Sequence, residues 1–304
     1  MSRIKYARMK IKKLIFNFRC RHVAKTPPVR CSPHSKVVIL SQLYHPDVTM
    51  FLLAAKSFAR FVPPSHFVIV DDGLTEADRA LLSEHLSEVR YVTSAELRSR
   101  AYSVPSGGAW ERLMAITELN DSQYVIQVDA DTLTIRRPDE VIDAVEQGHS
   151  FTLGTPTGRA IAPVAQISQA ASGSQSKHVQ TLAEAVIDKT SIFPDARYVR
   201  GCAGFAGFRP GTLTAGAVQS FSDQMRALLG DAKWREWGSE QVTSNFFVAN
   251  SPGAVVLPVD MYPFWSPERS TGDEQLKLIH FFGTFRFHGG AYTRLGRQVI
   301  QELV

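Results

Sequence analysis

The chain has 304 residues, of which 44% are hydrophobic and 21% charged, a composition typical of a soluble globular protein. Its length fits one large α/β domain or two smaller ones. The net charge of +5 is unevenly distributed, because residues 1–30 hold ten Lys and Arg and no acid, whereas the rest has 24 basic and 29 acidic residues. A mildly acidic body argues against a nucleic-acid-binding domain.

The basic segment predicts a membrane-associating tail and linker over residues 1–35. On a helix, six apolar side chains would share one face, with lysines and arginines on much of the rest: Ile4, Ala7, Ile11, Leu14, Ile15 and Phe18. Such a helix favours an anionic membrane interface. A disordered basic tail or a targeting peptide is the alternative. Pro27 and Pro28 end the helix and begin the linker.

Three scattered cysteines, Cys20, Cys31 and Cys202, form neither a disulfide framework nor a zinc pattern. They indicate a reducing, cytoplasmic environment. No apolar run is long enough to span a membrane. We therefore expect a cytoplasmic protein that lies peripherally on the inner membrane face.

From Lys36 onward, strand and helix patterns alternate up to a strand at 124–128. Strands are expected at 36–40, 66–71, 89–93 and 124–128, with helices at 50–61, 75–86 and 110–119 between them. This order predicts a single domain at 36–304 with a mainly parallel, twisted sheet and helices on both faces. Ligands bind beyond the carboxyl ends of such strands, where Asp71, Asp72, Asp129 and Asp131 would lie.

Later segments are less regular. Residues 166–177, "QISQAASGSQSK", are expected to form a surface loop or lid, and "CAGFAGFRP" a further strand. Gly201, Gly204 and Gly207 do not have the spacing of a dinucleotide-binding motif and are expected to allow close packing.

Asp129 and Asp131 form an Asp-x-Asp pattern directly after the apolar strand "YVIQV". Alternate residues of an extended segment point the same way, so the two carboxylates would face one point. A hard divalent cation, Mg²⁺ or Mn²⁺, suits such ligands. His280, which follows a late strand, could add a nitrogen ligand and favours Mn²⁺. Arg286 could grip phosphate oxygens, and Gly283 would let the backbone approach a bulky anion.

In these motifs the chain resembles nucleotide-sugar-dependent glycosyltransferases of the GT-A fold, and among them family 8, the retaining galactosyl- and glucosyltransferases. The resemblance covers most of residues 36–290 through four segments: "VDDGLTEADRALL", "WERLMAITELNDSQYVIQVDADTL", "SEQ" at 239–241 and "HFFGTFRFHG". It implies transfer of a hexose, galactose or glucose, from a UDP-sugar to a glycan or glycolipid with retention of configuration.

The resemblance also implies a role for each matching residue. Asp129, Asp131 and His280 would bind Mn²⁺, with Ala130 between the two acids. Gly283 and Arg286 would contact the diphosphate, and Tyr44 and Asp72 the nucleoside. Arg112 would lie near the metal carboxylates and the donor sugar. Gln241 would lie beside the anomeric carbon, and Glu240 would bind the sugar.

The sequence departs from the family pattern at three points. Val242 replaces the last acid of an Asp-Gln-Asp segment, Cys202 replaces an Asn before Ala-Gly, and no Pro-Trp follows Arg286. Two alternatives therefore stay open: an inverting transferase with Glu240 as the base, or a non-enzymatic membrane-associated binding protein. The tail suggests a lipid-linked acceptor, such as a precursor in lipopolysaccharide biosynthesis.

Overall fold

The computed structural model describes the backbone of residues 3–304 and the side chains of residues 9–304. The chain divides into two compact units. The first comprises Met1–Tyr91, Val128–Asp139 and Val259–Val304, and the second comprises Val92–Gln127 and Glu140–Pro258. Ile4 and Ala7 of the predicted apolar face have side chains outside the described residues.

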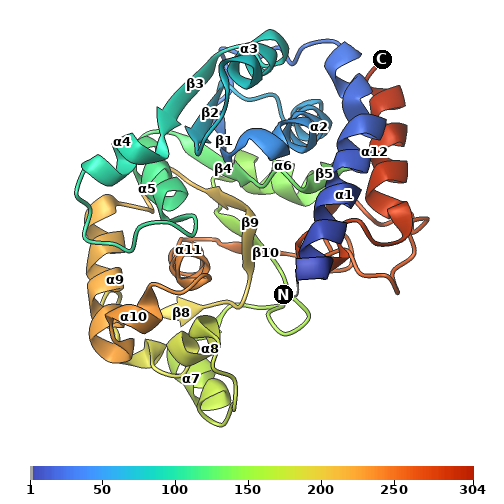
Figure 1. Cartoon of the computed structure of the whole chain (residues 1–304). Helices are drawn as coiled ribbons and strands as arrows, with labels where there is room; N and C mark the ends of the chain where they lie inside the picture. Colours follow the sequence, from blue (N-terminus) through green and yellow to red (C-terminus); the bar gives the residue numbers. More distant parts are fainter. Residues whose placement is uncertain (1–2) are drawn as a thin grey trace. The chain divides into compact units, whose positions relative to one another are not determined.

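The first unit contains the early strands and the chain's last helix (Figure 1). Its helices and strands are α1 (Arg3–Cys20), β1 (Val37–Leu43), α2 (Val48–Ala59), β2 (His66–Asp71), α3 (Glu76–His85), β3 (Val89–Thr93), β5 (Thr132–Thr134), β11 (Leu278–His280) and α12 (Ala291–Glu302). Short 3₁₀ turns are formed by Arg21–Lys25, His45–Asp47, Gly283–Phe285 and His288–Gly290.

The second unit contains the following helices and strands: α4 (Ser94–Ser99), α5 (Trp110–Leu119), β4 (Tyr124–Val128), α6 (Asp139–Glu146), β6 (Phe151–Leu153), β7 (Ala162–Pro163), α7 (Val164–Ser172), α8 (Val179–Glu184), β8 (Arg197–Tyr198), β9 (Cys202–Phe208), α9 (Ala215–Leu229), α10 (Asp231–Trp234), α11 (Ser239–Ala249) and β10 (Val255–Leu257). A 3₁₀ turn lies at Ile187–Lys189. The last residue of β4 and the first of α6 belong to the first unit, and the last two residues of β3, Val92 and Thr93, belong to the second.

The strands confirm the expected α/β fold with a mainly parallel sheet. In the first unit β1, β2 and β3 are neighbours, and β1 pairs in parallel with β2 from Val38 opposite His66 to Leu43 opposite Asp71. In the second unit the order is β10-β6-β9-β4, with β10 parallel and β9 antiparallel to β6. Since β1 and β2 are almost wholly buried and mostly apolar, packing fixes the position of their carboxyl ends.

The helix that we expected at 75–86 is α3, and Thr75 is its N-cap. The Thr75 hydroxyl accepts a hydrogen bond from the Asp78 backbone N–H, and the Asp78 carboxylate accepts one from the Thr75 N–H. This capping box satisfies backbone donors that a helix start otherwise leaves unpaired.

Two glycines of the Gly201, Gly204 and Gly207 series confirm the packing expectation. A Cβ at Gly207 would lie 2.2 Å from a ring carbon of Phe151, and one at Gly201 would lie 2.8 Å from Thr152 and from Asn245. Only glycine lets β9 approach its neighbours this closely.

The expected loop at 166–177 is wrong for its first part, because α7 extends to Ser172. The Ser168 hydroxyl donates a hydrogen bond to the Glu184 carbonyl, and the Asp188 N–H donates to the same hydroxyl. Packing of this kind stabilises a helix in a segment whose Ser, Gln and Ala composition does not by itself distinguish a helix from a loop.

The segment from Pro27 to residue 35, which we expected to form a linker, makes hydrogen bonds with the rest of the first unit. The Val29 N–H donates to the His85 carbonyl, and the Cys31 N–H to the Ser87 hydroxyl. The buried Lys56 ammonium donates to the carbonyls of Thr26 and Pro27. These bonds fix the path of the chain between α1 and β1.

Candidate active site

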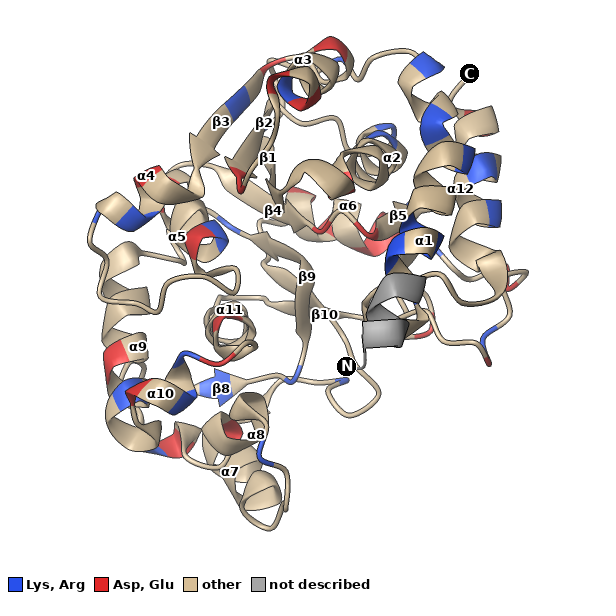
Figure 2. Cartoon of the chain, viewed as in Figure 1, with Lys and Arg blue, Asp and Glu red and all other residues tan. Residues whose placement is uncertain are grey.

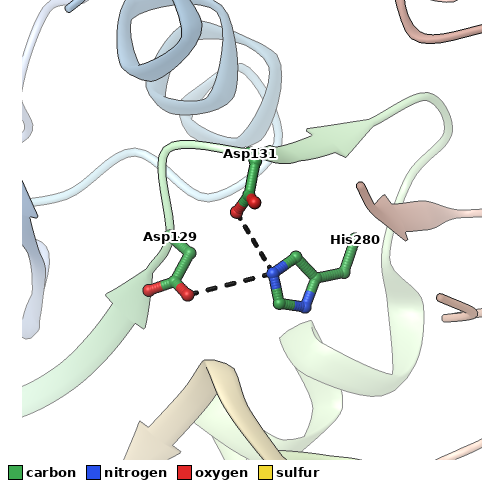
Figure 3. A group of neighbouring side chains, drawn as sticks. All are labelled: Asp129, Asp131 and His280. Atoms are coloured by element: carbon green, nitrogen blue, oxygen red, sulfur yellow. Dashed lines mark hydrogen bonds and ion pairs between the residues drawn. The ribbon is translucent and has the colours of Figure 1, made fainter. Parts of the chain in front are cut away.

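The Asp129, Asp131 and His280 side chains converge in the first unit (Figure 3). His280 Nε2 lies 3.1 Å from Asp131 Oδ1 and 3.8 Å from Asp129 Oδ2. One ligand atom from each residue lies within 4.8 Å of the other two. Both carboxylates therefore face the same ring nitrogen, as the sequence led us to expect.

Backbone pairing brings the histidine to the acids. β11 runs antiparallel to β5, with His280 opposite Thr132, and the Phe281 N–H donates to the Asp131 carbonyl at 2.8 Å. The imidazole has the rings of Phe264 and Phe282 nearby, at centroid distances of 5.8 and 5.5 Å. The three side chains are thus held in place by strand pairing and by packed aromatic rings.

The site is electrostatically asymmetric. Asp131 and His280 are buried, whereas 27% of the Asp129 side chain is exposed. Burial disfavours the charged form of Asp131, but His280 and Arg286 outweigh it and lower the pKa of this carboxyl. Asp131 is therefore held as a buried carboxylate.

Arg286 lies on the other side of Asp131. Its Nη2 forms an ion pair with Asp131 Oδ2, and its Nε–H donates to the Phe281 carbonyl at 2.9 Å. Gly283, at the start of the same turn, has φ of 66° and no heavy atom within 4 Å of its absent side chain. The turn therefore combines a guanidinium with an open stretch of backbone.

These residues fit a divalent cation. Two carboxylates and an imidazole form the oxygen and nitrogen donor set that Mn²⁺ accepts. The two oxygens of Asp131 have different partners: Oδ2 contacts Arg286, and Oδ1 faces the His280 nitrogen. A metal would take the place of the hydrogen bond between that oxygen and Nε2.

Tyr44 and Asp72 follow β1 and β2 in the first unit. Tyr44 is 46% exposed, as a ring available for stacking would be, and its hydroxyl accepts a hydrogen bond from Lys13 Nζ. Asp72 is exposed and accepts from the Gln42 amide at 3.4 Å. Asp71 differs from Asp72, because its buried carboxylate accepts from the N–H groups of Gly73 and Leu74 and pairs with Arg79.

The other three candidate residues, Arg112, Glu240 and Gln241, lie in the second unit. Arg112 of α5 and Glu240 of α11 are buried and form an ion pair, with Nη2 3.2 Å from Oε1. Gln241 is half-buried, accepts from the Ala203 N–H and donates to Gln180. The structure thus joins Arg112 to Glu240 as one polar pair within that unit.

Sequence reasoning missed Lys13 and Asp47. Lys13 forms an ion pair with Asp47, which precedes α2, and both side chains are 15% exposed. Burial raises the pKa of Asp47, whereas Lys13 and Arg286 act to lower it and Asp131 acts to raise it. Asp47 is therefore within electrostatic reach of the metal-ligand cluster. The position of Asp47 in "YHPDV", between the end of a strand and the start of a helix, is the sequence feature that could have identified it as a candidate site residue.

The fold is shared with solved glycosyltransferase structures. One is an active-site mutant of a protein named LgtC, with 13% identity, 86% of this chain and 95% of that chain covered, and a TM-score of 0.50. Another is the galactosyltransferase LgtC in complex with donor and acceptor sugar analogues, with 12% identity, the same coverage and a TM-score of 0.51. At this identity the likeness establishes the fold, which is the expected GT-A fold.

No protein-family model matches the sequence, and no curated protein sequence does so. Among the helices of the described residues, none combines the length and apolar character that spanning a membrane requires.

Proposed function

We propose that the protein is a metal-dependent glycosyltransferase that moves a hexose, galactose or glucose, from a UDP-sugar to a glycan or glycolipid acceptor. The observation that carries this proposal is the convergence of Asp129, Asp131 and His280 at one point beside Arg286. The fold shared with the galactosyltransferase LgtC supports it, since open α/β sheets generally bind their ligands beyond the carboxyl ends of the strands.

The candidate residues of the first unit would hold the donor. Asp129, Asp131 and His280 would bind Mn²⁺, or Mg²⁺, which when bound neutralises charge on the leaving nucleoside diphosphate. Arg286 would donate its planar fork to phosphate oxygens, and the open backbone at Gly283 would approach the same anion. Tyr44 and Asp72 would contact the nucleoside.

The second unit would handle the sugar. Arg112 and Glu240 would contact its hydroxyl groups, and Gln241 would lie beside the anomeric carbon. An amide cannot take a proton from the acceptor. In a retaining reaction the acceptor oxygen would instead bond to the anomeric carbon on the face that the diphosphate leaves, and the departing phosphate oxygen would receive the acceptor's proton. The buried ion pair of Glu240 with Arg112 favours sugar binding over a role as a base in an inverting reaction.

We propose in addition that the enzyme acts at the cytoplasmic face of a membrane on a lipid-linked glycan, as in lipopolysaccharide biosynthesis. The support is the basic tail of residues 1–30 and the exposure of four apolar side chains of α1: Ile11, Leu14, Ile15 and Phe18. A peripheral enzyme meets lipid-linked acceptors without a membrane span.

The test is a donor panel. The full chain is incubated with Mn²⁺ and each nucleotide sugar, and release of nucleoside diphosphate is measured without an acceptor. We expect slow hydrolysis of one UDP-hexose that stops on chelation and in Asp129→Asn. Nucleotide-sugar binding that is indifferent to metal and to Asp131→Ala would instead support a non-enzymatic binding protein.

A further inference from the structure

Helix α1 has an outer face that is apolar and uncovered. Ile11, Leu14, Ile15 and Phe18 are spaced three and four residues apart and are 57, 68, 47 and 66% exposed. The Arg21 guanidinium lies 3.9 Å from the Phe18 ring centroid, and Lys10, Lys12 and Arg19 are exposed nearby in the sequence. In a water-soluble helix such a stripe normally faces a core.

The inner face of α1 is docked on the first unit, beside α12 (Figure 1). The Phe16 ring is fully buried, with its centroid 4.2 Å from that of Tyr292, and Cys20 is buried too. A Cβ at Gly296 of α12 would lie 3.3 Å from Cys20 Sγ and 2.8 Å from a Leu53 methyl group. Glycine in a helix interior costs about 1 kcal/mol relative to alanine, so its presence here reflects this close contact.

The same inner face reaches the candidate donor site. Lys13 Nζ lies 3.0 Å from the Tyr44 hydroxyl and 4.7 Å from the centre of its ring, and it pairs with Asp47. The Asn17 amide donates to the Pro46 carbonyl at 3.3 Å. The β1–α2 loop that would hold the nucleoside is therefore attached to α1 at three residues, Tyr44, Pro46 and Asp47.

A second contact leads from α1 to the metal ligands. Tyr292, on which Phe16 packs, stacks on Phe281 with ring centroids 4.2 Å apart, and its hydroxyl donates to the Ala130 carbonyl. Phe281 follows His280, and Ala130 lies between Asp129 and Asp131. Tyr292 thus connects the buried face of α1 to residues directly next to Asp129, Asp131 and His280 in the sequence.

A pocket lined by residues of α1 and α12 adds positive charge near the apolar stripe. Its volume is about 590 Å³, and its lining includes Arg19, Arg294 and Arg297. No Asp or Glu of the described residues lines it. Blue bands mark the basic residues along both helices in Figure 2. An exposed apolar stripe beside arginines matches the acyl chains and phosphates of an anionic phospholipid surface.

We propose that α1 is a lipid-responsive part of the donor site. When the outer face lies on an anionic phospholipid bilayer, the helix is held against the first unit, and Lys13 keeps Tyr44 and Asp47 in the arrangement that binds nucleoside diphosphate. Lys13 is then a positioning residue, and donor binding is tighter on the membrane. This inference rests on the proposed function and adds a mode of regulation to it.

The test measures UDP binding by the full chain with Mn²⁺ in three conditions: buffer, phosphatidylcholine vesicles, and the same vesicles with phosphatidylglycerol. We expect the Kd to fall by about fivefold or more with phosphatidylglycerol only, since coupling between linked sites is typically of this size. The Leu14→Ser/Phe18→Ser variant alters exposed positions alone, so it should bind UDP normally in buffer and lose the response.

Lys13 gives a second readout. Lys13→Ala should raise the Kd and KM for the donor in buffer with little change in kcat, and Lys13→Arg should restore binding, which a merely structural role would not predict. Alkylation of Cys20 reports docking directly, because burial raises the pKa of this thiol to about 12 and a docked α1 protects it. Anionic vesicles should slow its alkylation further.

The outcomes are distinct. Absence of metal-dependent UDP binding in buffer would overturn the proposed function and this inference together. Metal-dependent binding with a Kd that anionic vesicles leave unchanged would overturn only the inference. Formation of a dimer that Leu14→Ser/Phe18→Ser disrupts would identify a second copy as the occupant of the outer face, and would also overturn it.

Discussion

His280 Nε2 lies 3.1 Å from Asp131 Oδ1, although 149 residues separate them in the sequence. The short ladder between β5 and β11 produces this contact, because it places His280 opposite Thr132, the residue after Asp131. The candidate metal site is therefore built from the chain's middle and its end by backbone pairing. The side chains have little freedom to separate, so the site is preformed.

We expect His280→Ala to weaken metal binding while leaving the fold intact. Loss of one of three ligands should raise the Mn²⁺ concentration for half-maximal donor hydrolysis by about tenfold or more, since even outer-shell changes cost 10–100-fold. Titration of activity with Mn²⁺ measures this. His34→Ala, at an exposed position of the same unit, is the matched control. Equal Mn²⁺ dependence of the two variants would show that the imidazole is not a ligand.

Substitutions of the neighbouring Asp71 and Asp72 should have different effects: the first should lower the stability of the fold, and the second should weaken UDP binding. Burial acts to raise the pKa of Asp71, but hydrogen bonds from Leu74, Arg79 and Gly73 outweigh it and lower the pKa. Asp71→Asn should therefore lower the free energy of unfolding by about 1–3 kcal/mol at neutral pH. The exposed Asp72→Asn should change it by less than about 0.5 kcal/mol and weaken UDP binding instead.

The sign of the pH effect follows from the lowered pKa. The stabilisation from Asp71 is fully present above the pKa of the unfolded chain, about 3.9, and is lost as pH falls through the still lower pKa of the folded state. The difference in free energy of unfolding between the wild type and Asp71→Asn, measured with urea, should therefore begin to narrow as pH falls below about 4. A gap between them that stays constant from neutral pH into this range would contradict the assignment.

Much of the fold was predictable because its early strands are apolar runs bounded by turns. The five residues of "YVIQV" form β4 as expected, and Asp129 and Asp131 follow it directly. The two acids could be proposed as metal ligands from the sequence, because carboxylates after a buried strand are costly without a partner. Helix α7 could not be predicted, since Ser, Gln and Ala allow helix and loop alike until packing decides.

The sequence predicted the exposed apolar face of α1 but not the face that docks against α12. Ile11, Leu14, Ile15 and Phe18 were expected on one face and are exposed together. Phe16 and Cys20 lie off that face and are the residues that the fold buries. Their partners Tyr292 and Gly296 lie in α12, far along the chain, so periodicity within α1 carried no information about docking.

Gly207 should tolerate no side chain. In Gly207→Ala the new methyl group would meet the Phe151 ring at 2.2 Å in the pairing of β6 with β9. We expect the free energy of unfolding to fall by about 1–3 kcal/mol, as for other overpacked cores. Gly216→Ala is the matched control, because its Cβ would meet nothing within 4 Å in α9. Denaturant unfolding that shows equal stability for both variants would refute this packing.

Both the charge and the planar shape of the Arg286 guanidinium should contribute to UDP affinity. Arg286→Ala removes the ion pair with Asp131 and the proposed phosphate donor, so UDP affinity with Mn²⁺ should fall by about tenfold or more, the value of one or two charge-assisted hydrogen bonds. Arg286→Lys keeps the charge but loses the fork that also bonds the Phe281 carbonyl, so its affinity should lie between the two. Isothermal titration measures both, with Arg90→Ala at an exposed position of β3 as the control. If Arg286→Ala bound UDP as tightly as Arg90→Ala did, the guanidinium would serve only to neutralise Asp131, and the diphosphate would need another partner.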